Sequence, residues 1–117
     1  MNTNLVSTGR ARILVVDDVQ ENLNLLSEVL EGAGYIVSVA PRGEIAIEIS
    51  KINPPDLILL DIVMPEMDGF ETCQQLKALE DTKHIPILFI SARDDLDNIL
   101  QSFQSGGVDY INKPFRN

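Results

Sequence analysis

The chain has 117 residues, a length that suits one domain. Its net charge is −9, from 18 acidic and 9 basic residues, which argues against direct binding of nucleic acid, because phosphate backbones recruit Lys and Arg. No apolar run approaches the ~20 residues of a membrane span. The polar N-terminus also lacks the apolar stretch of a signal peptide. We therefore expect a cytoplasmic domain over residues 11–117, preceded by a disordered tail over residues 1–10.

Predicted strands and helices alternate strictly along the chain. Apolar runs predict buried strands at 12–16, 57–60 and 87–90, an edge strand at 36–40 and a short fifth strand at 108–111. Helical spacing of apolar residues predicts four helices between them. The inward-facing residues of these helices are expected to be Leu23, Leu26 and Leu30; Ile45, Ile49 and Ile52; Phe70, Cys73 and Leu76; and Leu96, Ile99, Leu100 and Phe103. This alternation favours a parallel sheet with helices on both faces, a doubly wound α/β fold.

The alternation stops early at the C-terminal end. A further helix normally follows the fifth strand of such a fold, but the sequence ends at Asn117. We therefore expect five parallel strands without the final helix. An uncovered apolar face favours self-association, so a homodimer is among the expected assemblies.

Polar side chains follow the predicted strands where each strand ends. Asp17 and Asp18 follow the first strand, Asp61 the third, Ser91 the fourth and Lys113 the fifth. Parallel strands end at the same edge of a sheet, where ligands of open α/β folds bind. Singly, each residue has an ordinary alternative role: the first two Asp residues as helix caps, the Ser as a turn residue, the Lys as a solvated side chain.

As a set, these residues predict a phosphoryl-transfer site. Three crowded carboxylates repel one another, and a divalent cation relieves that repulsion. A ligand set made only of oxygen atoms favours Mg²⁺. A lysine and a hydroxyl at the same edge can contact an anion, and an aspartate can act as the nucleophile that forms an aspartyl phosphate.

Four motifs resemble the receiver domain of two-component response regulators and hybrid histidine kinases. They are Val15-Val16-Asp17-Asp18, Asp61-Ile62-Val63-Met64-Pro65-Glu66-Met67-Asp68-Gly69, Ser91-Ala92 and Lys113-Pro114-Phe115, and the resemblance extends from Arg12 to Phe115. It implies the flavodoxin-like strand order 2-1-3-4-5. It also implies a phosphorelay partner, either a histidine kinase or a phosphotransfer protein.

The resemblance further implies a role for each site residue. Asp61 would accept the phosphoryl group and, with Asp18 and the backbone carbonyl of Val63, ligate Mg²⁺, while Asp17 would act through a bound water. Ser91 and Lys113 would contact the phosphoryl group. Ser91 and Tyr110 would form the switch that reports phosphorylation to a partner.

Other classes of protein fit less well. A dehalogenase-type hydrolase needs a second Asp two residues after its nucleophile, and Val63 occupies that position. A P-loop protein is excluded because the sequence has no Gly-x-x-x-x-Gly-Lys-Ser/Thr motif. Asp17 and Asp18 would repel a flavin phosphate. The remaining alternative is a degenerate receiver that acts only as a protein-binding module, and Mg²⁺-dependent thermal stabilisation would distinguish the two.

Overall fold

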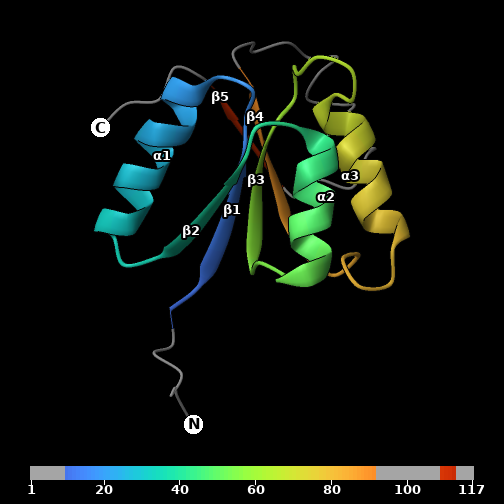
Figure 1. Cartoon of the computed structure of the whole chain (residues 1–117), viewed down its shortest axis with the longest axis horizontal. Helices are drawn as coiled ribbons and strands as arrows, with labels where there is room; N and C mark the ends of the chain where they lie inside the picture. The colour runs from blue at the N-terminus through green and yellow to red at the C-terminus, as the bar shows by residue number, and fades with distance from the viewer. Residues whose placement is uncertain (1–9, 92–108, 113–117) are drawn as a thin grey trace, which may run out of the picture.

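The computed structural model describes residues 10–91 and 109–112. Strands and helices alternate over residues 12–91 as the sequence predicts, with α1 on one face of a parallel sheet and α2 and α3 on the other (Figure 1). The elements are β1 (Arg12–Val16), α1 (Gln20–Gly32), β2 (Ile36–Ala40), α2 (Gly43–Ile52), β3 (Leu57–Asp61), α3 (Gly69–Ala78), β4 (Ile87–Ser91) and β5 (Asp109–Asn112).

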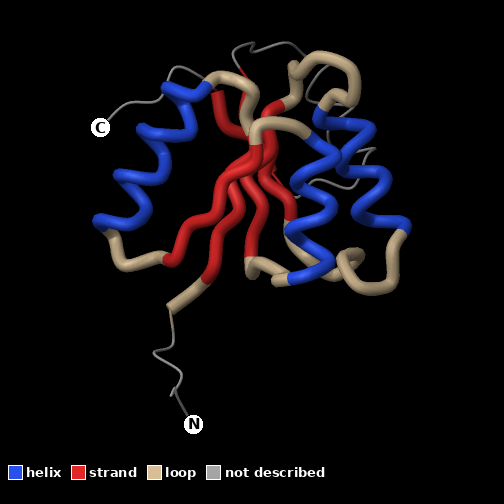
Figure 2. Tube along the Cα trace, in the orientation of Figure 1, coloured by secondary structure: helices blue, strands red, loops and turns tan. Residues whose placement is uncertain are grey.

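The sheet has the order β2-β1-β3-β4-β5, and every neighbouring pair is parallel. The order β2-β1-β3-β4 confirms the expected doubly wound topology, and β2 lies at an edge as predicted. β5 pairs with β4 at the opposite edge, through Leu88↔Asp109 to Ser91↔Asn112. In this order β1 and β3 are neighbours, and β3 is the middle strand of the sheet (Figure 2).

The central strands are buried on both faces, which is why their sequences are almost continuously apolar. One core cluster joins alternate strand residues such as Leu14, Leu60 and Phe89 to the inward face of α3. The Phe89 ring packs against that of Phe70 at 5.4 Å between centroids. The second cluster lies on the other face and joins Ile13, Val15, Leu59 and Ile90 to Leu23 of α1.

The three expected inward residues of α3, Phe70, Cys73 and Leu76, are all buried, which confirms that prediction. The prediction for α2 is wrong in one place, because the side chain of Ile52 is 83% exposed. The buried residues of α2 are the small ones, Gly43, Ala46 and Ser50, while Ile45 and Ile49 pack only partly against the core. Small side chains let α2 approach its neighbours closely, and its terminal isoleucine then points away from the sheet.

Three predictions concern residues outside the described ranges: the fourth helix with Leu96, Ile99, Leu100 and Phe103, the N-terminal tail at residues 1–9, and Lys113. Among the helices of residues 10–91, none is long and apolar enough to cross a membrane.

Candidate functional site

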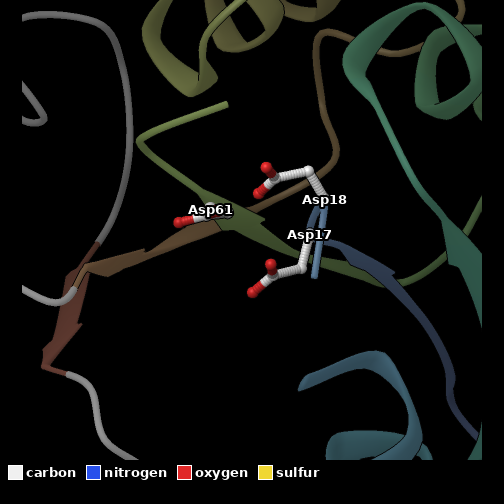
Figure 3. A group of neighbouring side chains, drawn as sticks. All are labelled: Asp17, Asp18 and Asp61. Atoms are coloured by element: carbon white, nitrogen blue, oxygen red, sulfur yellow. The ribbon is translucent and has the colours of Figure 1, made fainter. Parts of the chain in front are cut away.

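Three carboxylates converge at the carboxyl edge of the sheet (Figure 3). Asp61 is the last residue of β3, and Asp17 and Asp18 directly follow β1. β1 and β3 are paired in parallel with Val16 opposite Leu60, so the two strands end side by side. One oxygen from each carboxylate lies within 4.8 Å of the others. The structure therefore brings together the acidic residues that the sequence predicted at this edge.

The three carboxylates differ in their surroundings. Asp17 is fully buried and Asp61 is 3% exposed, whereas Asp18 is exposed to solvent. Two buried carboxylates and one exposed one at such short range form a strongly negative site that is open on one side. Such a site favours a hard cation that enters from solvent and keeps some of its water ligands.

Asp17 is held by hydrogen bonds that also position the start of α1. Its carboxylate accepts from the Val19 amide at 2.9 Å and from Asn22 Nδ2 at 3.1 Å. Its own amide donates to the carbonyl oxygen of Ala40 at the end of β2, at 3.2 Å. Asp17 is therefore not the N-cap of α1, which is Val19. The contribution of Asn22 was missed in the sequence, where it is only one polar residue among several in this helix.

The loop after Asp61 is closed by the start of α3. Asp68 is the N-cap, and its side chain accepts from the Glu71 amide at 2.9 Å in a capping box. The Gly69 amide donates to the Ile62 carbonyl oxygen at 2.9 Å. Glu66 has a φ of 66°, the left-handed conformation that lets the loop turn back within a few residues. The loop therefore ends at the N-cap Asp68, and α3 begins at Gly69.

Position 69 requires glycine, because its backbone lies too close to the Asp61 backbone to leave room for a side chain. A Cβ atom on Gly69 would lie 2.2 Å from the carbonyl oxygen of Asp61 and 2.8 Å from the Cα atom of Ile62. Real Cβ atoms do not approach other atoms so closely, so any other side chain would displace the loop or the end of β3. In the sequence, Gly69 stands out only as the last residue of the motif that begins at Asp61.

The structure gives the strand positions of Ser91 and Tyr110 and the exposure of Val63, but it does not describe Lys113. Val63 follows Asp61 by two residues, and its side chain is 63% exposed. Ser91 ends β4, and the β3–β4 register sets its neighbour Ile90 opposite Asp61. Tyr110 lies in β5 opposite Phe89. The side chains of Ser91 and Tyr110, and all of Lys113, are outside the described residues.

The carboxylates at this edge fit a divalent metal ion. All the donors are oxygen atoms, and their separation allows one small cation to contact more than one carboxylate. No nitrogen or sulfur ligand belongs to the group found among the described residues, which favours Mg²⁺ or a similar hard cation over zinc or copper.

The fold and this acidic site define a signalling receiver. The sequence profile of the response regulator receiver domain matches residues 13–117, and the chain belongs to this family. Receiver domains bind Mg²⁺ at an acidic pocket and interact with histidine kinases or phosphotransfer proteins.

Similar proteins support the same assignment. The chain is 44% identical over 104 residues to the response regulator PleD of Caulobacter vibrioides, a match that covers 89% of this chain and 23% of PleD. The structure of the chemotaxis protein CheY4 from Vibrio cholerae is similar with a TM-score of 0.88 and 29% identity, over 92% of this chain and 90% of that one. The Mn²⁺-bound form of response regulator Rcp1 is similar with a TM-score of 0.80 and 25% identity, over 91% and 83% of the two chains. This chain spans only about a quarter of the length of PleD.

Proposed function

We propose that Asp61 is the phosphoacceptor of this receiver domain and that its phosphorylation depends on Mg²⁺. The observation that carries the proposal is the approach of the Asp17, Asp18 and Asp61 carboxylates to within 4.8 Å at the end of the central strand. The donor would be a phosphohistidine on a histidine kinase or a phosphotransfer protein. Asp18, Asp61 and the Val63 backbone carbonyl would hold the ion directly, and Asp17 would act through a bound water.

The proposed reaction is an in-line displacement. A carboxylate oxygen of Asp61 attacks the phosphorus atom and forms an O–P bond, while the P–N bond breaks and its electron pair stays on the leaving imidazole. The incoming group and the nucleophile are both anionic, so their repulsion is the main obstacle. Mg²⁺ held by Asp18, Asp61 and the Val63 carbonyl would supply charge that reduces this repulsion. The rigid end of β3 holds Asp61 in a fixed direction, which favours reaction through proximity.

Two residues at neighbouring strand ends complete the proposed site. Lys113 would pair with the Asp61 carboxylate before reaction and with the phosphoryl oxygens afterwards, and Ser91 would contact a phosphoryl oxygen. Tyr110 would change its position when Ser91 moves. Such a switch needs two conformations that differ by only a few kcal/mol, so that a new phosphoryl group can shift their populations.

The experiment that tests the proposal is intact-mass measurement after incubation with Mg²⁺ and acetyl phosphate. Wild-type protein and the Asp61→Asn variant are treated in parallel. We expect one added phosphoryl group on the wild type and none on the variant. If the wild type gains no phosphoryl group, or if the variant gains one too, Asp61 is not the acceptor.

The second candidate function is a degenerate receiver that only binds a partner protein. It is distinguished by thermal unfolding with and without Mg²⁺, because a module that has lost its phosphoacceptor chemistry gains little stability from the ion. The intact acidic trio in this chain favours the active receiver.

A further inference from the structure

Thr72 lies in the first turn of α3, and its hydroxyl makes a partly buried hydrogen bond to the loop that follows Asp61. Its side chain is fully buried, and its hydroxyl donates to the carbonyl oxygen of Asp68 at 2.8 Å. The Thr72 amide donates to the same oxygen at 3.0 Å. Threonine hydroxyls often bond to the carbonyl four residues earlier in a helix, so this hydrogen bond alone would be ordinary. What sets Thr72 apart is the close contact that its hydroxyl makes with α2.

The first residue of α2 packs directly on the Thr72 hydroxyl. A Cβ atom on Gly43 would lie 2.1 Å from Thr72 Oγ1 and 3.0 Å from the sulfur atom of Met67. Gly43 is buried and its φ angle does not require glycine, so the reason for glycine here is this close approach. The start of α2 therefore limits how far the Thr72 hydroxyl and the Met67 side chain can move.

The same turn of α3 also contacts the phosphoacceptor strand. Gly69 lies against the Asp61 carbonyl oxygen and donates its amide to Ile62. The start of α3 is thus confined between the first residue of α2 and the end of β3. Residues 62–68, which include the proposed Val63 ligand, are attached at both ends to these contacts.

We infer that Thr72 is a positioning residue for the phosphoryl-transfer site, acting through the Asp68 carbonyl and Gly69 on the backbone of residues 61–63. This inference rests on the proposed function of Asp61. When valine replaces Thr72, the backbone amide at position 72 still donates to the Asp68 carbonyl, but the hydroxyl's hydrogen bond to the same carbonyl is lost. A methyl group, which is larger than the hydroxyl, then faces Gly43. The loop then shifts, and both Asp61 and the Val63 carbonyl move relative to Asp17 and Asp18.

The test compares three variants, two that each remove a threonine hydroxyl and one that keeps it. Thr72→Val removes the hydrogen bond at nearly constant volume, and Thr72→Ser keeps the hydroxyl. Thr82→Val is the matched control, because Thr82 is equally buried and its hydroxyl donates to the Leu76 carbonyl oxygen at 2.6 Å. Thr82 follows the C-terminal end of α3, whereas Thr72 lies near its N-terminal end. The readouts are the rate of phosphorylation by acetyl phosphate, the apparent dissociation constant for Mg²⁺, and hydrogen exchange of the Gly69 amide.

We expect Thr72→Val to slow phosphorylation about fivefold, because that is the effect of losing the net contribution of one hydrogen bond. Its Mg²⁺ binding should weaken, and its Gly69 amide should exchange faster. Thr72→Ser should retain most of the wild-type rate, and Thr82→Val should lose stability without losing rate. A Thr72→Val rate within twofold of the wild type, or an equal loss in Thr82→Val, would overturn the inference.

Hydrogen exchange separates this inference from the proposed function. If the wild type is not phosphorylated at all, the proposed function fails. Faster exchange of the Gly69 amide in Thr72→Val alone would still support the role of Thr72 in holding the loop, whereas unchanged exchange would overturn it. A double-mutant cycle with Gly43→Ala and Thr72→Ala then tests the contact itself. The Gly43→Ala change should slow phosphorylation less when the Thr72 hydroxyl is absent, and additive effects would contradict the contact.

Discussion

Gly69 lies against the backbone of Asp61 so closely that a Cβ atom on it would be 2.2 Å from the Asp61 carbonyl oxygen. The atoms in contact are backbone atoms, which cannot rotate away as the end of a flexible side chain can. This contact therefore couples the position of the proposed phosphoacceptor to the start of α3. A change on either side of it must move the other.

Gly69→Ala should destabilise the fold and disturb the acidic site together. Overpacking of this kind costs about 1–3 kcal/mol, because the added methyl group forces a backbone shift. Urea unfolding measures the loss, and phosphorylation by acetyl phosphate should slow in the folded fraction. Gly32→Ala is the control, since a Cβ atom there meets no other atom within 4 Å. Equal stability of the two variants would contradict the importance of the Gly69 contact.

The sequence predicted the parts of the fold that depend on local pattern. The apolar runs of β1, β3 and β4 predicted buried strands because a strand covered on both faces needs apolar residues at every position. Convergence of Asp17, Asp18 and Asp61 was also predictable, because parallel strands end at a common edge. The expected strand order came from the resemblance, since alternation alone does not determine it.

Contacts between elements could not be read from the same patterns. The exposed Ile52 has the spacing of an inward residue, yet the close packing of the small residues on α2 decides which stripe of that helix is buried. Gly43 and Gly69 have the appearance of turn residues, and their close approaches depend on the three-dimensional arrangement. The bond from Asn22 to Asp17 likewise joins residues that no motif connects.

Mg²⁺ should stabilise the wild-type chain, and Asp18→Asn should remove most of that effect. At a concentration one hundred times its dissociation constant, a ligand raises the free energy of unfolding by about 2.7 kcal/mol. The variant has one fewer carboxylate in the cluster, so its metal-free form should be more stable than that of the wild type, because repulsion is reduced. Thermal unfolding with and without Mg²⁺ measures both effects.

Asp81→Asn is the control for the Mg²⁺ experiment, because it makes the same change of charge at an exposed residue outside the acidic cluster. It should keep the full stabilisation by Mg²⁺. A similar loss in Asp81→Asn and Asp18→Asn would mean that the ion acts through general screening of the −9 net charge and not at the carboxylate site.

Ser50→Ala should stabilise the protein. Ser50 is fully buried on α2, and its hydroxyl oxygen has no hydrogen-bond partner within the part of the chain that the structure describes. A buried hydroxyl without a partner costs about 1–3 kcal/mol, and alanine removes that cost with little change in volume. Chemical unfolding of Ser50→Ala and of Ser27→Ala, a partly buried serine in α1, separates this effect from the higher helix propensity of alanine. Equal gains in the two variants would show that the buried hydroxyl costs nothing.

Cys73 should make the stability fall at alkaline pH. Burial raises the pKa of its thiol from 9.0 to about 11, and the nearby Lys77 ammonium offsets part of this rise. Between those two values the unfolded chain loses the thiol proton while the folded chain keeps it, so the unfolded state gains stability as pH rises. The contribution is about 3 kcal/mol and is complete only above the folded pKa.

The measurement is the free energy of unfolding of the wild type and Cys73→Ala from pH 8 to pH 11. Cys73→Ala has a lower stability at pH 8, because the substitution leaves a small cavity, but the difference between the two proteins should shrink as the pH rises. Alkylation of the folded wild type at pH 8 should also be slow, because the reactive thiolate is scarce and the side chain is fully buried. A constant difference in stability across this range would mean that the thiol ionises equally in the folded and unfolded chains, which its burial on the inward face of α3 argues against.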